Sequence, residues 1–117
     1  MGGSLGLAAS RRITNCHVTG YGHRPDTLRR AMELGAIQQS CHSAAEAVRE
    51  ADLVVLATPV GLFDQLLREI APALKPGSIV TDVGSTKRAI ARAAETILPA
   101  GVHFVGSHPM AGSEKRG

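Results

Sequence analysis

The stretch L-V-V-L-A at positions 53–57 decides the fold class of this chain. Every position of the run is apolar, whereas a strand with one side in solvent alternates apolar and polar residues. A short, continuous apolar run is typical of a strand that is covered on both of its faces. Because sheets covered on both faces are mostly parallel, the sequence predicts a parallel sheet around this strand.

Helical and extended patterns alternate on both sides of this run. Pro25 and Gly35 bracket one amphipathic segment, and Ser43 and Glu46 have the spacing of a capping box, which begins a second helix that is expected to reach about residue 50. Further strands are expected over 15–21, 78–83 and 102–106, and further helices from 58 to 72 and from 86 to 98. Strands and helices in alternation predict a doubly wound, Rossmann-like α/β fold with right-handed crossovers.

The N-terminal segment resembles the start of a helix whose preceding strand is absent. Gly2 fits the last glycine of a dinucleotide-binding fingerprint, with Gly3 beside it, and the strand and the earlier glycines are then expected upstream of Met1. In the strand order 3-2-1-4-5-6, the loss of the first strand leaves two half-sheets with unpaired inner edges. An ordinary glycine-rich N-terminus is the alternative interpretation.

Composition narrows the class of protein. A chain of 117 residues with 44% hydrophobic residues can bury one core, so we expect one domain or part of one. A net charge of +3 from scattered arginines, with 3% aromatic residues, does not favour nucleic-acid binding. Cys16 and Cys41 are too few for a metal site or a disulfide framework and indicate reduced thiols. With neither a membrane span nor a signal segment, the sequence predicts a soluble cytoplasmic protein that binds no metal.

Polar and glycine residues follow each predicted strand. Ligands of doubly wound folds bind beyond the carboxyl ends of the strands, and free amides at helix N-termini favour phosphate groups there. We therefore expect a cofactor site at this rim. Its predicted members are Gly2, Gly3, Gly22, His23, Arg24, Thr58, Pro59, Val60, Gly84 and Ser85.

Three motifs carry a more specific signal: A-T-P-V-G at 57–61, T-D-V-G-S-T-K at 81–87 and G-S-H-P-M-A-G-S-E-K at 106–115. In this order and spacing, they resemble the nucleotide-binding domain of the prephenate dehydrogenase family, and the resemblance extends from Gly2 to Gly117. It implies that residues 1–117 form a partial dinucleotide-binding domain, truncated at both ends, of an enzyme that uses NAD or NADP. Members of the family oxidatively decarboxylate prephenate or arogenate in tyrosine biosynthesis. They also have a helical C-terminal domain that dimerises and binds substrate, and we expect this fragment to be inactive without it.

The resemblance also implies roles for individual residues. The catalytic histidine of the family matches His108, and its partner serine, which also lies near the substrate, matches Ser85. Ser113 and Glu114 match positions that line the substrate pocket. The simpler alternatives are that His108 is a loop histidine and that Ser85 caps a helix. Asp82 is expected to fix its loop by hydrogen bonds.

Gly22 departs from the family pattern, because many relatives that use NAD have an acidic residue at this position. With Arg24 close by, this difference favours NADP over NAD, unless Arg24 is only a solvated turn residue. Two other classes of function remain open on sequence alone. One is a different Rossmann-domain reductase that acts on a hydroxy acid or an imine, and the other is a nucleotide-binding remnant without catalysis.

Overall fold

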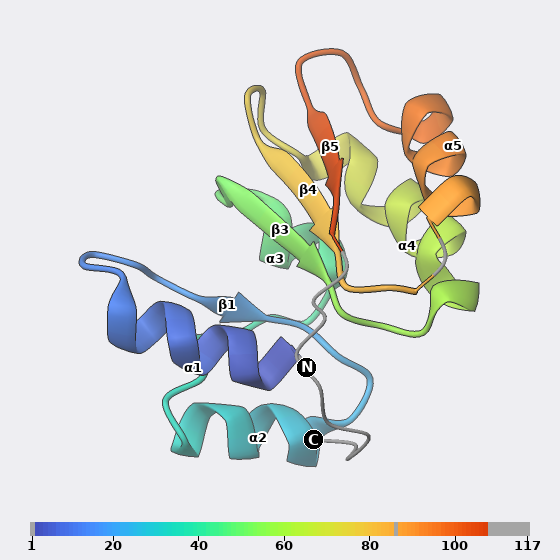
Figure 1. Cartoon of the computed structure of the whole chain (residues 1–117). Helices are drawn as coiled ribbons and strands as arrows, with labels where there is room; N and C mark the ends of the chain where they lie inside the picture. The colour runs from blue at the N-terminus through green and yellow to red at the C-terminus, as the bar shows by residue number, and fades with distance from the viewer. Residues whose placement is uncertain (1, 86, 108–117) are drawn as a thin grey trace.

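Helices and strands alternate along the chain in the computed structural model, which describes residues 2–85 and 87–107 (Figure 1). The first half contains α1 (Gly2–Arg12), β1 (Thr19–Gly20), α2 (Pro25–Glu33), β2 (Gln39–Ser40) and α3 (Ala44–Val48). The second half contains β3 (Leu53–Leu56), α4 (Phe63–Ile70), β4 (Ile79–Asp82), α5 (Lys87–Ile97) and β5 (His103–Gly106). Short 3-10 helices, Val60–Leu62 and Ala71–Ala73, flank α4. The predicted α/β class is confirmed.

All strand pairs are parallel, and they form two separate sheets. One sheet has the order β1-β2 and the other the order β3-β4-β5. Among the described residues, no strand pairs with the second edge of β1 or of β3. This is the arrangement predicted for a doubly wound sheet without its first strand.

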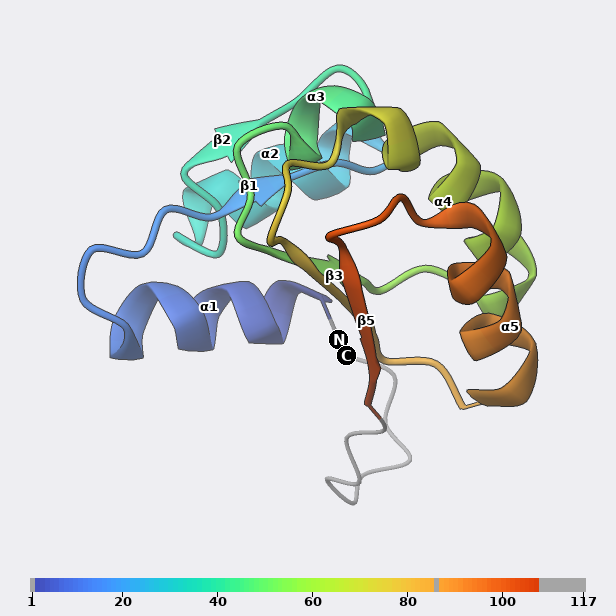
Figure 2. The same ribbon diagram turned by 90° about the horizontal axis from the view of Figure 1, so that it is seen from above.

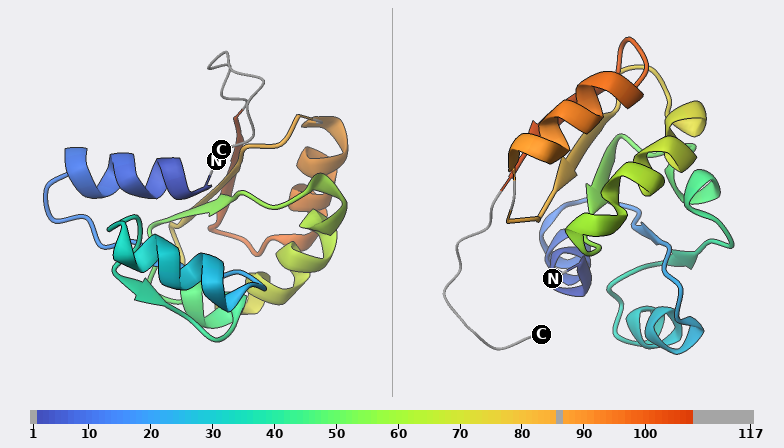
Figure 3. Two further views of the ribbon diagram at one scale, coloured as in Figure 1. Left: turned by 90° about the horizontal axis from the view of Figure 1, so that it is seen from below. Right: turned by 90° about the vertical axis from the view of Figure 1, so that its right-hand side faces the viewer.

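The main core lies between the larger sheet and three helices. Side chains from β3 and β4 pack against α3, α4 and α5, and the fully buried members include Phe63, Leu67 and Val80. Figures 1 and 3 show α4 and α5 side by side. Figures 1 and 2 place α1 on the opposite side of β3 from these two helices. The burial of large aliphatic and aromatic side chains, at about 1.5–3 kcal/mol each, stabilises this half of the molecule.

The prediction that the strand at 53–57 is covered on both faces is wrong for the described residues. Val54 and Leu56 are buried, whereas the alternate residues Leu53 and Val55 are 56% and 38% exposed. Ile79 is likewise exposed on β4, one strand further along the sheet. The apolar run shows that both faces are suitable for burial, but the described residues supply packing for only one of them.

Most helices begin where the capping residues and prolines of the sequence predict. The extents of the strands agree less well with the prediction. The Ser43 hydroxyl accepts a hydrogen bond from the Glu46 amide (3.1 Å), and the Glu46 carboxylate accepts one from the His42 amide (2.9 Å). The cap is therefore reciprocal, as expected, although the glutamate reaches one residue further back. Helix α3 ends at Val48, before the predicted residue 50. Strand β2 was not predicted, because Gln39–Ser40 is short, polar and exposed.

Candidate nucleotide-binding and catalytic site

The parallel register brings the ends of three strands to one edge of the larger sheet. Leu56 pairs with Asp82, and Asp82 pairs with Gly106, so the segments after these residues leave the sheet at the same edge. Thr58, Gly84 and Ser107 therefore lie near the same rim. This is the edge at which doubly wound folds bind their ligands.

Helix α1 begins close to this rim. A Cβ atom on Gly2 would lie 3.0 Å from the Cβ atom of Ala57, just after β3. Further along the helix, a Cβ atom on Gly6 would lie only 2.3 Å from the carbonyl oxygen of Ala36, so only glycine fits there. A Cβ atom on Gly3 would meet nothing within 4 Å. The free amides at the N-terminus of α1 thus lie at the strand ends, where they can bind a phosphate group.

Gly6 is a residue that the sequence reasoning missed. Gly2 and Gly3 were chosen from the fingerprint, whereas the tightest approach of α1 to the rest of the fold is at Gly6. The available signal was the spacing of four residues from Gly2, which puts both glycines on one face of the helix.

Thr58, Val60 and Gly84 meet at the rim. The Thr58 hydroxyl oxygen is buried and, within the described ranges, has no hydrogen-bond partner. A Cβ atom on Gly84 would lie 3.1 Å from Val60 Cγ2 and 3.0 Å from Asp82 Oδ2, so a side chain here would have to displace these neighbours by a few tenths of an ångström. Pro59 is exposed between them. The unsatisfied threonine hydroxyl is a polar group that a bound ligand could complete.

The side chain of Asp82 joins the ends of β4 and β5. It is fully buried, and its Oδ2 accepts a hydrogen bond from the Gly84 amide at 2.8 Å. Its Oδ1 accepts one from the Ser107 amide at 3.3 Å, and the Ser107 hydroxyl donates to the Asp82 carbonyl oxygen. The prediction that Asp82 fixes its loop is confirmed, and the same side chain also holds the neighbouring strand end.

Ser85 is exposed, and it comes directly after the turn that Asp82 holds. Ser107 is the last described residue of the chain, and it is half-buried. The predicted site residues His108, Ser113 and Glu114 lie outside the described residues. The structure therefore joins Gly84, the residue before Ser85, and Ser107, the residue before His108, to the same carboxylate.

The loop after β1 contains Gly22, His23 and Arg24. The rings of Tyr21 and His23 make an edge contact with centroids 5.7 Å apart. Arg24 is exposed at the N-cap position of α2, and no ion pair involves it within the described part of the chain. A Cβ atom on Gly22 would approach nothing closer than Leu28 Cδ2 at 4.0 Å. This position can therefore accept a side chain, so its lack of a carboxylate is a chemical difference and not a packing requirement.

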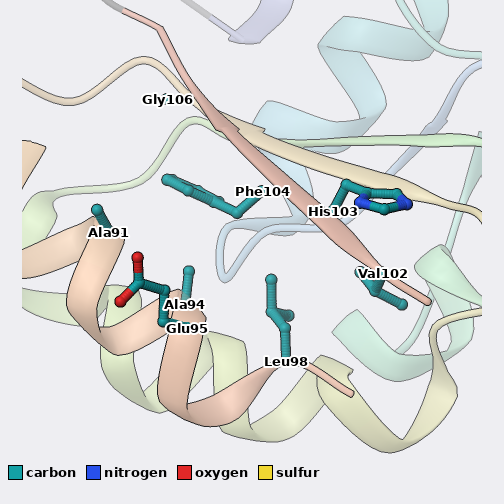
Figure 4. Close-up of a pocket in the computed structure, with 8 residues that line it drawn as sticks. All are labelled: Ala91, Ala94, Glu95, Leu98, Val102, His103, Phe104 and Gly106. Atoms are coloured by element: carbon teal, nitrogen blue, oxygen red, sulfur yellow. The ribbon is translucent and has the colours of Figure 1, made fainter. Parts of the chain in front are cut away.

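A separate pocket lies between β5 and α5 and is shown in Figure 4. Its walls are mainly apolar, with Glu95 and His103 as the charged or titratable members. None of the predicted site residues lines it. This pocket is therefore separate from the rim at which the sequence predicts the cofactor site.

The described residues have few other groups with evident chemistry. Cys16 and Cys41 are both free thiols, and burial, followed by the charge of Glu46, raises the pKa of Cys41 above its ordinary value, which keeps this thiol protonated. Residues 2–85 and 87–107 contain no group of three or more His, Cys, Asp or Glu side chains that could hold a metal ion. No helix in this part of the chain is long and apolar enough to cross a membrane.

The fold has the features of a nucleotide-binding domain of the doubly wound α/β class. These features are parallel strands, a helix N-terminus at the carboxyl ends of the strands, and glycine turns at the same rim. Residues 5–117 match the family model described as "Prephenate dehydrogenase, nucleotide-binding domain". The chain belongs to this family. The match decides against the alternative that the chain is the domain of another Rossmann reductase family.

Individual relatives agree with the family match. The chain is 36% identical to the prephenate dehydrogenase of Bacillus subtilis over 118 residues, covering all of this chain and 32% of that protein. The crystal structure of Aquifex aeolicus prephenate dehydrogenase with hydroxyphenyl propionate and NAD+ superposes with a TM-score of 0.86 and 32% identity, over 98% of this chain and 40% of that one. Synechocystis arogenate dehydrogenase gives a TM-score of 0.79 and 30% identity, over 95% of this chain and 38% of that one. The chain thus spans about a third of the length of the Bacillus relative.

Proposed function

We propose that this chain is the nucleotide-binding part of an enzyme that oxidises and decarboxylates prephenate or arogenate with NADP+ or NAD+. The observation that carries the proposal is the rim at which Asp82 ties the turn before Ser85 to Ser107, the residue before His108. In a member of this family, that link supports the proposal that His108 and Ser85 act on the same substrate.

The chemistry assigns a separate task to each residue. His108 takes the proton of the substrate hydroxyl as general base, and Ser85 orients the imidazole. A bound nicotinamide would supply the hydride acceptor for the carbon that carries this hydroxyl. Loss of carbon dioxide then leaves an aromatic ring. Ser113 and Glu114 contact the substrate from the segment that follows His108.

The described residues fit a dinucleotide. The N-terminal amides of α1 lie at the strand ends and suit the pyrophosphate. The buried Thr58 hydroxyl is available to a polar group of the cofactor, and Pro59, Val60 and Gly84 shape the adjoining surface. Gly22, His23 and Arg24 follow β1, where the adenosine ribose binds in this class of fold.

The complete enzyme is proposed to include more than this chain. A helical domain that dimerises and supplies basic residues to the substrate completes the site, and the protein works in the cytoplasm. We define the restored enzyme as the Bacillus subtilis prephenate dehydrogenase in which this chain replaces the matching segment. The alignment covers the whole of this chain, so the exchange introduces no gap at either junction.

NADP+ is the expected cofactor of the restored enzyme. An acidic residue after this strand accepts the ribose hydroxyls of NAD and repels a 2′-phosphate, whereas here Gly22 is open and Arg24 is exposed. We expect Arg24→Ala to lower kcat/KM for NADP+ by about tenfold, which corresponds to one charge-assisted hydrogen bond. For NAD+, kcat/KM should change by less than about twofold, because NAD has no 2′-phosphate.

Two variants sharpen this test. Gly22→Asp should shift the preference toward NAD+, since the position has room for a side chain. Arg29→Ala is the matched control, because Arg29 lies on the same helix but is paired with Asp26 at 3.2 Å. A restored enzyme that prefers NAD+, or an Arg24→Ala variant with unchanged kcat/KM for NADP+, contradicts the assignment.

A further inference from the structure

We infer that Asp82 is a positioning residue that sets the spacing between the two catalytic loops. Its carboxylate accepts a hydrogen bond from a backbone amide of each loop, Gly84 on one and Ser107 on the other. The inference rests on the proposed function, because it concerns the distance between Ser85 and the segment that begins at His108.

The geometry shows how one side chain can set this spacing. Asp82 is the last residue of β4, and it pairs with Gly106 of β5. One carboxylate oxygen holds the amide of Gly84, and the other holds the amide of Ser107. The strand ladder joins the same two segments only as far as Gly106. The aspartate therefore extends the link between the strands by two residues after β4, to Gly84, and by one residue after β5, to Ser107, the residues that adjoin Ser85 and His108.

Further hydrogen bonds beside Asp82 strengthen the link between the ends of β4 and β5. The Ser107 hydroxyl donates to the Asp82 carbonyl oxygen, and the Thr81 hydroxyl donates to the Val105 carbonyl oxygen and lies 3.3 Å from the Ser107 hydroxyl. Side-chain and backbone bonds thus cross between the two strand ends at several points. Burial of Asp82 removes competing water, so each of its hydrogen bonds has a defined geometry.

Asparagine has nearly the same size as aspartate, but it lacks the negative charge and one of the two acceptor oxygens. Asp82→Asn therefore tests the hydrogen bonds without changing the volume of the side chain. Both carboxylate oxygens of Asp82 accept from amide groups, whereas asparagine has one oxygen and one NH2 group. In Asp82→Asn one of the two amides must therefore face another donor, and one loop loses its hold. Since a displacement of about 1 Å at a reacting group can cost about 10²-fold in rate, the effect should fall on turnover.

The test uses Asp82→Asn in the restored enzyme. We expect kcat to fall by roughly 10–100-fold, while KM for the cofactor and for prephenate changes by less than about threefold. The hydrogen-exchange rate of at least one of the Gly84 and Ser107 amides should rise by at least about tenfold, because its acceptor is lost. Unchanged kcat, or unchanged exchange at both amides, overturns the inference.

Two controls separate positioning from stability. Ile70→Val removes one methylene from a buried residue at the end of α4 and should lower Tm without lowering kcat. If Asp82→Asn lowers kcat no more than this variant does at a matched loss of Tm, the aspartate is only structural and the inference fails. Asp64→Asn removes an exposed carboxylate that pairs with Arg68, and it should leave both kcat and the two exchange rates unchanged.

The remaining outcomes are also decisive. If Asp82→Asn does not fold, Ser107→Ala removes the hydroxyl bond to the Asp82 carbonyl and should lower kcat by about 3–10-fold at nearly unchanged Tm, and unchanged kcat counts against the inference. If the unsubstituted restored enzyme is folded but inactive, the proposed function fails. In that case the exchange rates of Gly84 and Ser107 in Asp82→Asn still decide whether the aspartate holds both loops.

Discussion

Replacing His108 with asparagine in the restored enzyme is expected to lower kcat by roughly 10²–10⁴-fold. Asparagine keeps a hydrogen-bonding group of similar shape but cannot take the proton of the substrate hydroxyl. KM for the substrate should change much less, because the imidazole acts on the transition state and not on binding. Steady-state rates with saturating cofactor measure both quantities.

The pH profile gives a second, independent result. The base must be neutral to accept a proton, so activity should fall as the pH drops through the imidazole pKa, near ~6.5 for an unperturbed histidine. This acidic limb should be absent from the His108→Asn variant. Ser85→Ala should reduce kcat less, and the two substitutions together should be non-additive, because both residues act on one proton transfer.

A matched control is available elsewhere in the chain. His42 is exposed at the start of α3, so His42→Asn should leave kcat and the pH profile unchanged. Near-normal turnover with the same acidic limb in His108→Asn would show that the base lies in another part of the enzyme.

The second large effect concerns the stability of the 117-residue chain as an isolated polypeptide. We expect it to melt without a sharp cooperative transition and to show no prephenate-dependent activity. The strands form two sheets with open inner edges, and Leu53, Val55 and Ile79 expose apolar side chains on one face of the larger sheet. Small domains have only about 5–15 kcal/mol of stability, so the unpaired edges and the exposed apolar face should exhaust it.

Calorimetry and circular dichroism of the purified chain test this expectation. The same segment within the restored enzyme is the control, and there it should unfold cooperatively. A sharp transition of the isolated chain, together with micromolar binding of NADP+ or NAD+, contradicts the prediction.

The sequence predicted the order of the elements because helix periodicity, caps and strand ends are local properties. Pro25 and the Ser43 cap begin α2 and α3 as expected, and Ser78 to Val83 contains β4. Strand β2 could not be predicted, since two polar residues carry no periodic signal. The open face of β3 could not be predicted either, because apolar residues do not reveal what covers them.

The sequence predicts which residues form the candidate site, but it does not predict the hydrogen bonds and contacts that join them. Motif spacing identified Ser85 and the turn at Gly84, and the parallel register then brought them beside Ser107. The contacts of Asp82 with both strand ends depend on tertiary geometry, and so does the close approach of Gly6 to Ala36. No periodicity or motif in a single sequence indicates which amides a buried carboxylate will hold.

The most direct test of the central claim is the steady-state rate of prephenate-dependent cofactor reduction by the restored enzyme. We expect reduction of NADP+, and more slowly of NAD+, with release of carbon dioxide, at a rate within about 10²-fold of the parent Bacillus enzyme with its own cofactor. Arogenate is assayed in parallel. If the restored enzyme melts cooperatively but reduces neither cofactor with either substrate while the parent turns over, this chain is not the nucleotide-binding domain of a working dehydrogenase.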